Sequence, residues 1–303
     1  MNKIIYYIDV LLAHNVSEEF TYKHETIEKP RVGMIVLAPL RSGEKVGIIT
    51  KVNSVLNDSK IKLKFIKEIS PEYRLNSKMI KFLNWVSNYN LIDRGLVLKM
   101  ILSHSKFYFK KKKTKELTSN IKKNVKTIEL SLEQKRASQD ILKIFQQRNF
   151  KPVLLDGVPG SGKTEVYFDV IKKFIKDGEQ VLIMFPEVSL TGDFVNRIEE
   201  RFGFSPVVWH SKISTAYKTK VLKSIIDGTS QIIVGARSSL FLPYKNLSMI
   251  VLDEEHDSSY KQEEQGIYHA RDMSVVKSSI EDIPIILTSA TPSLETIFKV
   301  LME

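Results

Sequence analysis

Short apolar runs mark the first part of the chain, and each has a length typical of a β-strand. The runs are Ile4–Ile8, Val32–Leu37, Val46–Ile49 and, with less regular alternation, Lys62–Ile69. Arg41–Glu44 separates two of them and predicts a turn, because its glycine tolerates a positive φ. The pattern predicts a small β-barrel or an open sheet.

A helical period follows these runs. Apolar residues recur about every 3.6 positions between Met79 and Tyr89, and Ser77 is placed to cap the start of the helix. We expect Trp85, within this stretch, to be a core residue rather than a surface on which bases stack.

From Leu130 onward, helical stretches alternate with short continuous apolar runs. Leu132–Phe145 and Thr164–Lys176 have the helical period. The runs predicted to be buried strands are Val153–Leu155, Val181–Phe185, Ile232–Val234, Met249–Leu252 and Ile283–Leu287. This alternation predicts an α/β fold whose parallel sheet is covered by helices on both faces.

A phosphate-binding motif follows the first of these strands. The segment reads GVPGSGKT and matches G-x-x-x-x-G-K-[ST] between a predicted strand and a predicted helix. Its glycines would let backbone N–H groups wrap phosphates, and the helix N-terminus adds a favourable dipole. Lys163 would neutralise the β- and γ-phosphates, and Thr164 would offer a hydroxyl to Mg²⁺. The predicted nucleotide contacts are Gly157, Gly160, Ser161, Gly162, Lys163 and Thr164.

An acidic cluster ends the strand at Met249–Leu252. Carboxylates at the carboxyl end of a buried parallel strand lie at the ligand-binding edge of the sheet. Asp253 could hold Mg²⁺ through water, and Glu254 could orient and deprotonate an attacking water. Glu255 and Asp257 are predicted to support the site or face solvent. With Lys163, these two acids, Asp253 and Glu254, are the candidate catalytic residues.

Clusters of small and hydroxyl residues close other strands on the same predicted edge. They are Phe185–Thr191, Gly235–Ser239 and Thr288–Ser293. We expect them to contact a DNA backbone or to sense the state of a bound nucleotide.

Composition narrows the class of protein. The chain has 303 residues, enough for about two domains, and no cysteine, which removes disulfides and cysteine-based zinc sites. No apolar run is long enough for a membrane span and the N-terminus lacks a secretory pattern, so we expect a cytoplasmic protein with no membrane partner.

The charge favours a polyanionic partner. The formal net charge is +11, from 46 basic and 35 acidic residues. Nine lysines and one acid lie between Lys106 and Lys126, next to Phe107, Tyr108 and Phe109. Lysines interleaved with aromatics suit phosphate attraction and base stacking, although a lysine-rich chain without such a partner is the alternative.

The region from about Leu130 to the end resembles the first motor lobe of superfamily-two DNA helicases, in particular the bacterial replication-restart helicases. The matching segments are Gly157–Thr164, Phe185–Thr191, Trp209–Ser211, Gly235–Pro243, Asp253–Asp257, Ser258–Glu264, Tyr268–Asp272 and Thr288–Ser293. The resemblance implies a RecA-like lobe that uses ATP and Mg²⁺, the latter held through Thr164 and Asp253.

The resemblance also implies roles for individual residues. Gln134 would read adenine, and the loop from Tyr260 to Arg271 would couple DNA binding to hydrolysis. The implied DNA contacts are Gly235, Arg237, Ser238, Tyr260, Tyr268 and Arg271. The implied transmitters of nucleotide state are Thr288, Ser289 and Thr291.

The N-terminal region is similar to the domain with which this family captures the 3′ end of a nascent strand. The similarity includes Phe20–Tyr22, where the family has Phe-Asp-Tyr and this chain has Thr21. The missing aspartate puts selectivity for a 3′ end in question. Phe20 and Lys64 are the candidates for that pocket, and ordinary strand positions are the simpler interpretation of both.

The comparison with the family predicts three parts: a mainly-β 3′-end DNA-binding domain at 1–105, a basic linker at 106–128 and the ATP-binding lobe at 129–303. The family's winged-helix domain, second motor lobe, arginine finger and zinc cluster are expected to be missing. We therefore predict an incomplete ATP-dependent 3′-to-5′ helicase of replication restart, with little unwinding alone.

Partners and alternatives follow from the same resemblance. The implied partners are forked and single-stranded DNA, single-strand-binding protein and other primosome proteins. The main alternative is a non-catalytic fork DNA-binding module with a residual nucleotide-binding lobe. A small-molecule P-loop kinase and a transport ATPase are less consistent with the DNA-facing segments.

Overall fold

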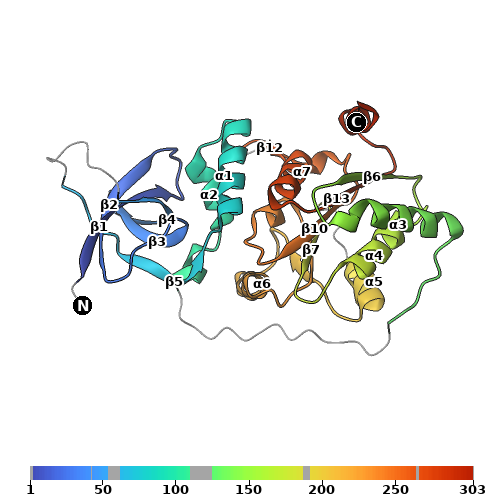
Figure 1. Cartoon of the computed structure of the whole chain (residues 1–303), viewed down its shortest axis with the longest axis horizontal. Helices are drawn as coiled ribbons and strands as arrows, with labels where there is room; N and C mark the ends of the chain where they lie inside the picture. The colour runs from blue at the N-terminus through green and yellow to red at the C-terminus, as the bar shows by residue number, and fades with distance from the viewer. Residues whose placement is uncertain are drawn as a thin grey trace. The chain divides into compact units, whose positions relative to one another are not determined.

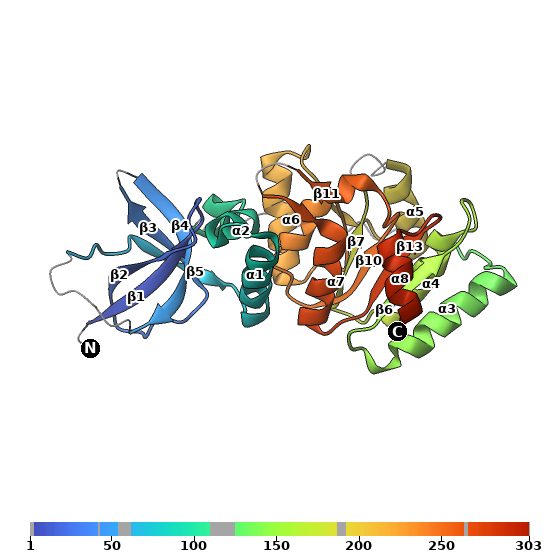
Figure 2. The ribbon, with the colours of Figure 1, turned by 90° about the horizontal axis from the view of Figure 1, so that it is seen from above.

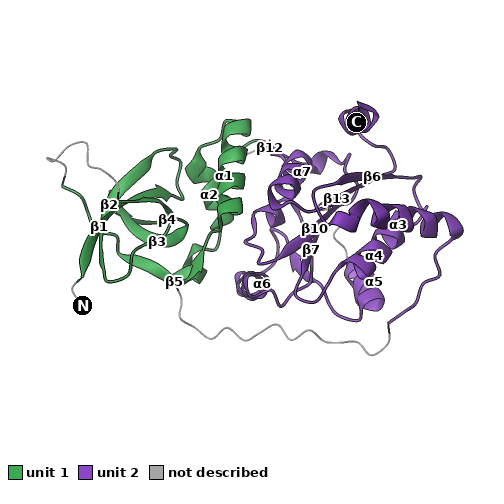
Figure 3. Ribbon diagram, in the orientation of Figure 1, with its two compact units in different colours: residues 1–113, 264–267 green, residues 114–263, 268–303 purple. Residues whose placement is uncertain are grey.

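The computed structural model describes residues 3–41, 43–53, 62–109, 125–186, 192–263 and 266–302 (Figure 1). It divides into two compact units, residues 1–113 with 264–267 and residues 114–263 with 268–303 (Figure 3). The predicted division at 105 and 128 stays a prediction. Most of the predicted basic linker, residues 110–124, lies outside the described residues.

The first unit is built on an antiparallel sheet followed by helices. Its elements are β1 (Ile4–Leu12), β2 (Glu19–Thr26), β3 (Met34–Leu40), β4 (Gly43–Val52), β5 (Glu68–Arg74), α1 (Ser77–Asn90), α2 (Arg94–Ile101) and the 3-10 helix η1 (Ser105–Phe109). The strand order is β2-β1-β4-β3-β5, with every neighbouring pair antiparallel. Alternate residues such as Ile8, Val10 and Leu12 of β1 form the core. The mainly-β prediction is confirmed.

A short segment before β5 joins the two sides of this sheet. The N–H of Lys23 on β2 donates to the carbonyl of Lys64 at 2.9 Å, and Ile66 N–H donates back to Lys23 at 3.0 Å. One residue further on, Lys67 N–H donates to Leu37 on β3 at 2.8 Å. The sheet thus closes toward a barrel at this place. The strand predicted over Lys62–Ile69 is wrong in its bounds, because Lys62–Lys67 forms only an isolated bridge and β5 begins at Glu68.

Local details of this unit differ from the sequence interpretation. At the turn after β3, Arg41 takes the left-handed conformation (φ 54°), whereas Gly43 already pairs with Leu40 as the first residue of β4. Helix α1 is capped by Asn76, whose side chain accepts the Met79 N–H, and not by Ser77. Asparagine one position earlier provides the same acceptor geometry.

The aromatic residues near α1 and η1 are also placed differently. Trp85 is only half-buried and stacks on Tyr89, with ring centroids 4.5 Å apart, so it is not a full core residue. Phe107 and Tyr108 are buried instead, with both rings against Tyr73 of β5. These two aromatics belong to the folded unit and do not present a stacking surface for bases.

The second unit alternates helices with parallel strands. Its elements are α3 (Leu132–Ile144), η2 (Phe145–Gln147), β6 (Pro152–Asp156), α4 (Lys163–Phe174), β7 (Gln180–Met184), α5 (Gly192–Phe202), β8 (Val207–Trp209), α6 (Thr215–Asp227), β9 (Ile232–Gly235), η4 (Arg237–Phe241), β10 (Leu247–Leu252), η5 (Ser258–Tyr260), β11 (Lys261–Gln262), β12 (Tyr268–His269), α7 (Ala270–Glu281), β13 (Ile285–Ser289) and α8 (Leu294–Met302).

The main sheet has the order β6-β13-β10-β7-β9-β8, and all its neighbouring pairs are parallel. Alternate strand residues such as Ile183, Val234 and Val251 pack with α3, α4 and α5 in one core, and α7 lies against β10 on the opposite face (Figure 2). The predicted parallel sheet is confirmed. Its geometry brings every strand's carboxyl end to one edge.

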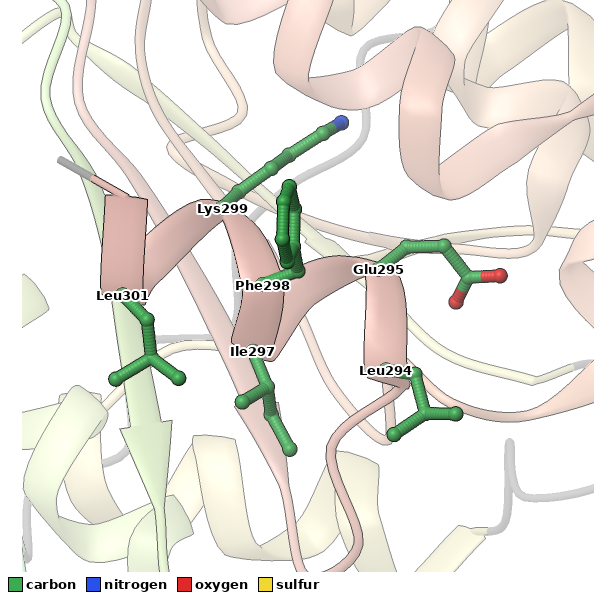
Figure 4. Close-up of a pocket in the computed structure, with 6 residues that line it drawn as sticks. All are labelled: Leu294, Glu295, Ile297, Phe298, Lys299 and Leu301. Carbon is green, nitrogen blue, oxygen red and sulfur yellow. The ribbon is translucent and has the colours of Figure 1, made fainter.

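Helix α8 leaves apolar side chains in solvent. Leu294, Phe298 and Leu301 are all more than half exposed. Together with three neighbours on the helix they line an open pocket (Figure 4). None of the predicted site residues lines it. Within the described residues, no helix combines the length and apolarity needed to cross a membrane.

A buried lysine predicts how stability changes with pH. Lys277 on α7 is 1% exposed, its ammonium lies 5.7 Å from the Tyr244 ring centroid, and burial lowers its pKa to about 8. The unfolded chain has a lysine pKa near 10.5, so between these values it binds more protons than the native chain. Stability contributed by this group therefore rises with pH from about 8 to 10.

We expect Lys277→Met to raise the melting temperature at pH 7.5 and to flatten its increase between pH 7.5 and 9.5. Thermal unfolding followed by circular dichroism at both pH values measures this. Lys172→Met, at an exposed position on α4, is the control and should leave the increase unchanged. An identical increase in Lys277→Met and the parent chain would contradict the assignment.

Candidate active site

The phosphate-binding loop lies between β6 and α4, as predicted. Gly160 and Gly162 both have left-handed backbones, with φ of 78° and 81°. A Cβ at Gly162 would also collide with the side-chain amide of Gln134. The left-handed backbone therefore favours glycine there, and any larger residue would also displace the Gln134 amide. Helix α4 begins at Lys163, so its unpaired N–H groups face the loop.

The charged and amide side chains at this loop are held by main-chain carbonyls. Lys163 Nζ donates to the Gly157 carbonyl at 2.7 Å. Gln134 Nε2 donates to the Ser161 carbonyl at 2.9 Å, and Gln134 Oε1 accepts the Ser131 N–H at 2.9 Å. Gln134 thus caps α3 and contacts the loop at once. Its predicted role in reading adenine stays a prediction.

Asp253 is the best-connected acid of the site. It is 7% exposed, and Tyr167 donates its hydroxyl to Oδ2 at 3.0 Å while Thr288 Oγ1 donates to Oδ1. Burial, and then the charge of Asp253, hold the pKa of Tyr167 well above its ordinary value, so the phenol remains a donor. Tyr167 also hydrogen-bonds Thr164. The two residues predicted to serve Mg²⁺, Thr164 and Asp253, therefore share one partner.

Tyr167 was not singled out from sequence. The available signal was its spacing, because it lies three residues after Thr164 and so on the same face of α4. This spacing does not reveal that Asp253 is the hydrogen-bond partner of Tyr167, because Asp253 is 86 residues away in the chain.

Glu254 and the neighbouring histidine meet the end of β13. Glu254 has a left-handed backbone (φ 49°), a conformation that costs free energy in a non-glycine residue and is found at functional sites. His256 Nδ1 lies 3.6 Å from Glu254 Oε2 and 2.7 Å from Ser289 Oγ. Ser289 also accepts the Thr291 N–H on its side chain and the Gly157 N–H on its carbonyl. One serine thus joins the acidic turn to the phosphate-binding loop.

The remaining acids of the cluster differ from each other. Asp257 accepts the Ser259 N–H at 2.7 Å and caps η5. Glu255 is fully buried rather than solvent-facing, and its carboxylate accepts from Ser293, Thr296 and Arg271.

The predicted DNA contacts are only partly on the surface. Gly235 is buried, Arg237 is half-buried and Ser238 is exposed, at the carboxyl end of β9. Arg237 donates to the carbonyl of Lys261. Thr291 is exposed beyond β13. Residues 187–191 of the predicted Phe185–Thr191 cluster lie outside the described residues, as do Glu264 and Gln265.

Two predicted aromatic contacts are interior residues. Tyr260 is fully buried, and its hydroxyl donates to the carbonyls of Asp253 at 2.6 Å and Met184 at 3.1 Å. Tyr268 is 3% exposed and packs edge-on against Phe241. Neither ring presents a face on which a base could stack, because both side chains are buried inside the lobe. Their contact with DNA stays a prediction.

In the first unit, the candidate 3′-end residues lie on β2 and in the segment before β5. Phe20 is half-buried against the strand core, and the Lys64 side chain is exposed while its carbonyl serves the closing bridge. Thr21 donates its hydroxyl to Asp9 Oδ1 at 2.7 Å, from the position directly opposite on β1. The Asp9 carboxylate on the neighbouring strand therefore lies against Thr21, the position at which the family pattern has aspartate.

The donor set fits Mg²⁺ held together with a nucleotide. Within the described ranges, no group of three or more His, Cys, Asp or Glu residues could hold a metal ion. Mg²⁺ is usually bound by one or two carboxylates, waters and phosphate oxygens. Thr164 and Asp253, linked through Tyr167, supply a hydroxyl and a carboxylate of that kind.

This arrangement agrees with comparisons to known proteins. The DEAD/DEAH box helicase family matches residues 131–300, more than half of the chain, so the chain belongs to that family. A second match, to a domain described as 3′ DNA-binding domain (3′BD), covers residues 9–103.

Named relatives extend the likeness across both units. Replication restart protein PriA of Rickettsia felis is 39% identical over 270 residues, which are 89% of this chain and 40% of that protein. The same-named protein of Bacillus subtilis is 41% identical over 174 residues, 57% of this chain and 22% of its own length. The chain thus spans about 40% of the length of the former relative.

Among solved structures, the chain is similar to RecG bound to a three-way DNA junction, with 19% identity and a TM-score of 0.42. That likeness covers 72% of this chain and 28% of the RecG chain.

The Tyr167 link yields a test of stability. Tyr167→Phe removes the hydroxyl that serves both Asp253 and Thr164 and leaves a buried carboxylate short of a donor. We expect a loss of about 1–3 kcal/mol in the free energy of unfolding of the lobe. Urea unfolding followed by circular dichroism at pH 7 measures it.

The matched control is Tyr217→Phe, at a half-buried position on α6, which should change the free energy of unfolding by less than about 0.5 kcal/mol. Equal losses in the two variants would show that the hydroxyl of Tyr167 has no special role.

Proposed function

We propose that this chain supplies the ATP-binding and DNA-binding parts of an ATP-dependent 3′-to-5′ DNA helicase that acts in replication restart. The observation that carries the proposal is the junction of Thr164, Tyr167 and Asp253 beside an intact phosphate-binding loop. The family match and the relatives named replication restart proteins support it.

In this proposal, different residues of the site bind the phosphates, hold the metal ion and orient the attacking water. N–H groups of Gly157–Gly162 and the start of α4 cradle the phosphates, and Lys163 exchanges its carbonyl partner for phosphate oxygens. Thr164 and Asp253 would hold Mg²⁺, and the ion would supply positive charge beside the phosphates. Glu254 orients the attacking water and accepts its proton. The hydrogen bond between Ser289 and His256 then transmits the change in nucleotide state to the loops beyond β13.

We also propose forked and single-stranded DNA as the nucleic-acid partner. The net charge of +11 favours a polyanion, and the match to a 3′ DNA-binding domain supports contact by the first unit. Gly235, Arg237 and Ser238 would contact the backbone from the second unit. Single-strand-binding protein and other primosome proteins are proposed partners, and the cytoplasm is the proposed location.

The decisive measurement is ATP hydrolysis by the purified chain, with and without forked DNA. We expect DNA-stimulated turnover, and a fall of about 10²-fold or more in Lys163→Ala, because the phosphates lose their charge partner. Lys172→Ala, on the exposed side of the same helix, should retain turnover. DNA binding with no turnover in any protein would favour the non-catalytic fork-binding alternative.

Arg237 offers a test of DNA contact. We expect Arg237→Ala to weaken single-stranded DNA binding to a similar extent for different sequences and to reduce the salt dependence by about one charge. Fluorescence anisotropy over a series of salt concentrations measures both quantities. Arg136→Ala, exposed on α3, should change neither, and an unchanged salt dependence in Arg237→Ala would remove Arg237 from the DNA interface.

A further inference from the structure

Helix α1 of the first unit carries a stacked pair of aromatic side chains at its surface (Figure 3). The Trp85 and Tyr89 rings have centroids 4.5 Å apart and lie 16° from parallel. Trp85 is half-buried, whereas Tyr89 is 62% exposed. The buried side of the helix consists of Met79, Phe82, Leu83, Val86 and Ser87. The core of the unit is thus closed by residues other than Tyr89.

The Tyr89 ring differs from the other exposed aromatic rings of the described residues, which are Phe65 and Phe298. The Lys23 ammonium lies over the Phe65 ring, 6.0 Å from its centroid, and Phe298 belongs to the apolar pocket of α8. Only Tyr89, of these three, lies nearly parallel to a second ring. A flat exposed ring that is held in place by another ring is the kind of surface on which a nucleobase stacks.

The outer side of the Tyr89 ring is not covered by the helix itself. Helix α1 ends at Asn90, and Leu91 takes the left-handed conformation that terminates it, so no further turn follows Tyr89. The acid that comes next in the chain, Asp93, accepts the Ser17 hydroxyl at 2.8 Å. The ring is therefore held from one direction, by Trp85, and open to solvent over most of its remaining surface.

Lysines lie on the same side of α1 as the aromatic pair. Lys81 precedes Trp85 by four residues and Lys78 precedes Lys81 by three, and residues at these spacings are neighbours on a helix surface. Both lysines are exposed, and α1 contains no acidic residue. Lys81 lies about 6 Å from Trp85 along the helix axis. Positive charge beside a flat aromatic surface is the combination that binds the phosphates and bases of a single strand.

We propose that Lys81, Trp85 and Tyr89, the α1 platform, form a binding site for single-stranded nucleic acid. A base stacks on Tyr89, Trp85 keeps that ring in place, and Lys81 attracts a neighbouring phosphate. Bases inside a duplex already have both faces covered by their neighbours, so the site favours a single strand. The inference rests on the proposed function, since it assumes single-stranded DNA as a partner, and it adds a site apart from Phe20 and Lys64.

Trp85 provides a direct readout of the α1 platform. The chain has two tryptophans, so Trp209→Phe leaves Trp85 as the source of indole fluorescence. We expect an unlabelled oligothymidine to change the Trp85 emission, with saturation at the same concentration as the anisotropy of a fluorescein-labelled copy. If Trp209→Phe does not fold, the emission of Trp85→Phe is subtracted from that of the parent chain.

Variants of Tyr89 separate stacking from charge. We expect Tyr89→Ala to weaken oligothymidine binding by about fivefold or more and to leave the affinity for an abasic oligomer of equal length within about twofold. Tyr89→Phe retains the ring and should bind oligothymidine within about twofold of the parent chain. The matched control is Phe298→Ala, which removes a ring of similar exposure from the second unit and should leave both affinities unchanged.

Lys81→Gln tests the phosphate contact. Since Lys81 would meet the phosphate and not the base, we expect weaker binding of both oligomers and a salt dependence reduced by about one charge. Anisotropy over a series of salt concentrations measures both quantities. An unchanged salt dependence would remove Lys81 from the α1 platform.

The outcomes separate this inference from the proposed function. Oligothymidine binding that leaves the Trp85 emission unchanged, or that is unaffected by Tyr89→Ala, overturns the inference and assigns this side of α1 to a protein partner. Equal weakening of oligothymidine and abasic binding in Tyr89→Ala also overturns it, because the ring would then act without a base. Failure of the parent chain to bind oligothymidine at all contradicts the proposed function, and the inference with it.

Discussion

The buried carboxylate of Asp253 is the group on which the geometry of the second unit's site depends. It lies at the end of β10, one strand away from β6 and its phosphate-binding loop, and it takes hydroxyl donors from Thr288 on the intervening strand β13 and from Tyr167 on α4. A buried carboxylate needs such donors, because a buried polar group without a hydrogen-bond partner costs free energy. The same contacts hold α4 and β13 against the end of β10.

A second layer of contacts surrounds that carboxylate. Ser289 joins His256 to the phosphate-binding loop, and Glu255 joins Arg271 to the start of α8. Ser289 and Glu255 are fully buried, whereas the His256 side chain reaches solvent. The first unit is held mainly by contacts between strands. Main-chain hydrogen bonds of Lys23 close the sheet, and the Thr21 hydroxyl donates to Asp9 on the neighbouring strand.

Most of the fold could be predicted from the sequence. The apolar strands of the second unit, the strand–loop–helix around Gly157–Thr164 and the mainly-β first unit are all present. The errors are local or depend on distant partners. Asn76 and Ser77 are equally good caps by type, and β5 begins later than the apolar pattern suggested because Lys62–Lys67 bonds to β2 and β3 instead. The burial of Tyr108 could not be read from its lysine-rich neighbours.

What the sequence by itself determined is the chemistry that is local in the chain. The phosphate-binding loop needs glycines at left-handed positions next to a lysine and a threonine, and a strand ending in acids places Asp253 and Glu254 at one edge of the sheet. The tertiary structure alone decided which groups are paired. Tyr167 and Asp253 are 86 residues apart, and Glu255 and Thr296 are 41 apart. Hydrogen-bonding demand in a buried site is met by whichever donors the packing delivers, and residue type or spacing along the chain does not reveal them.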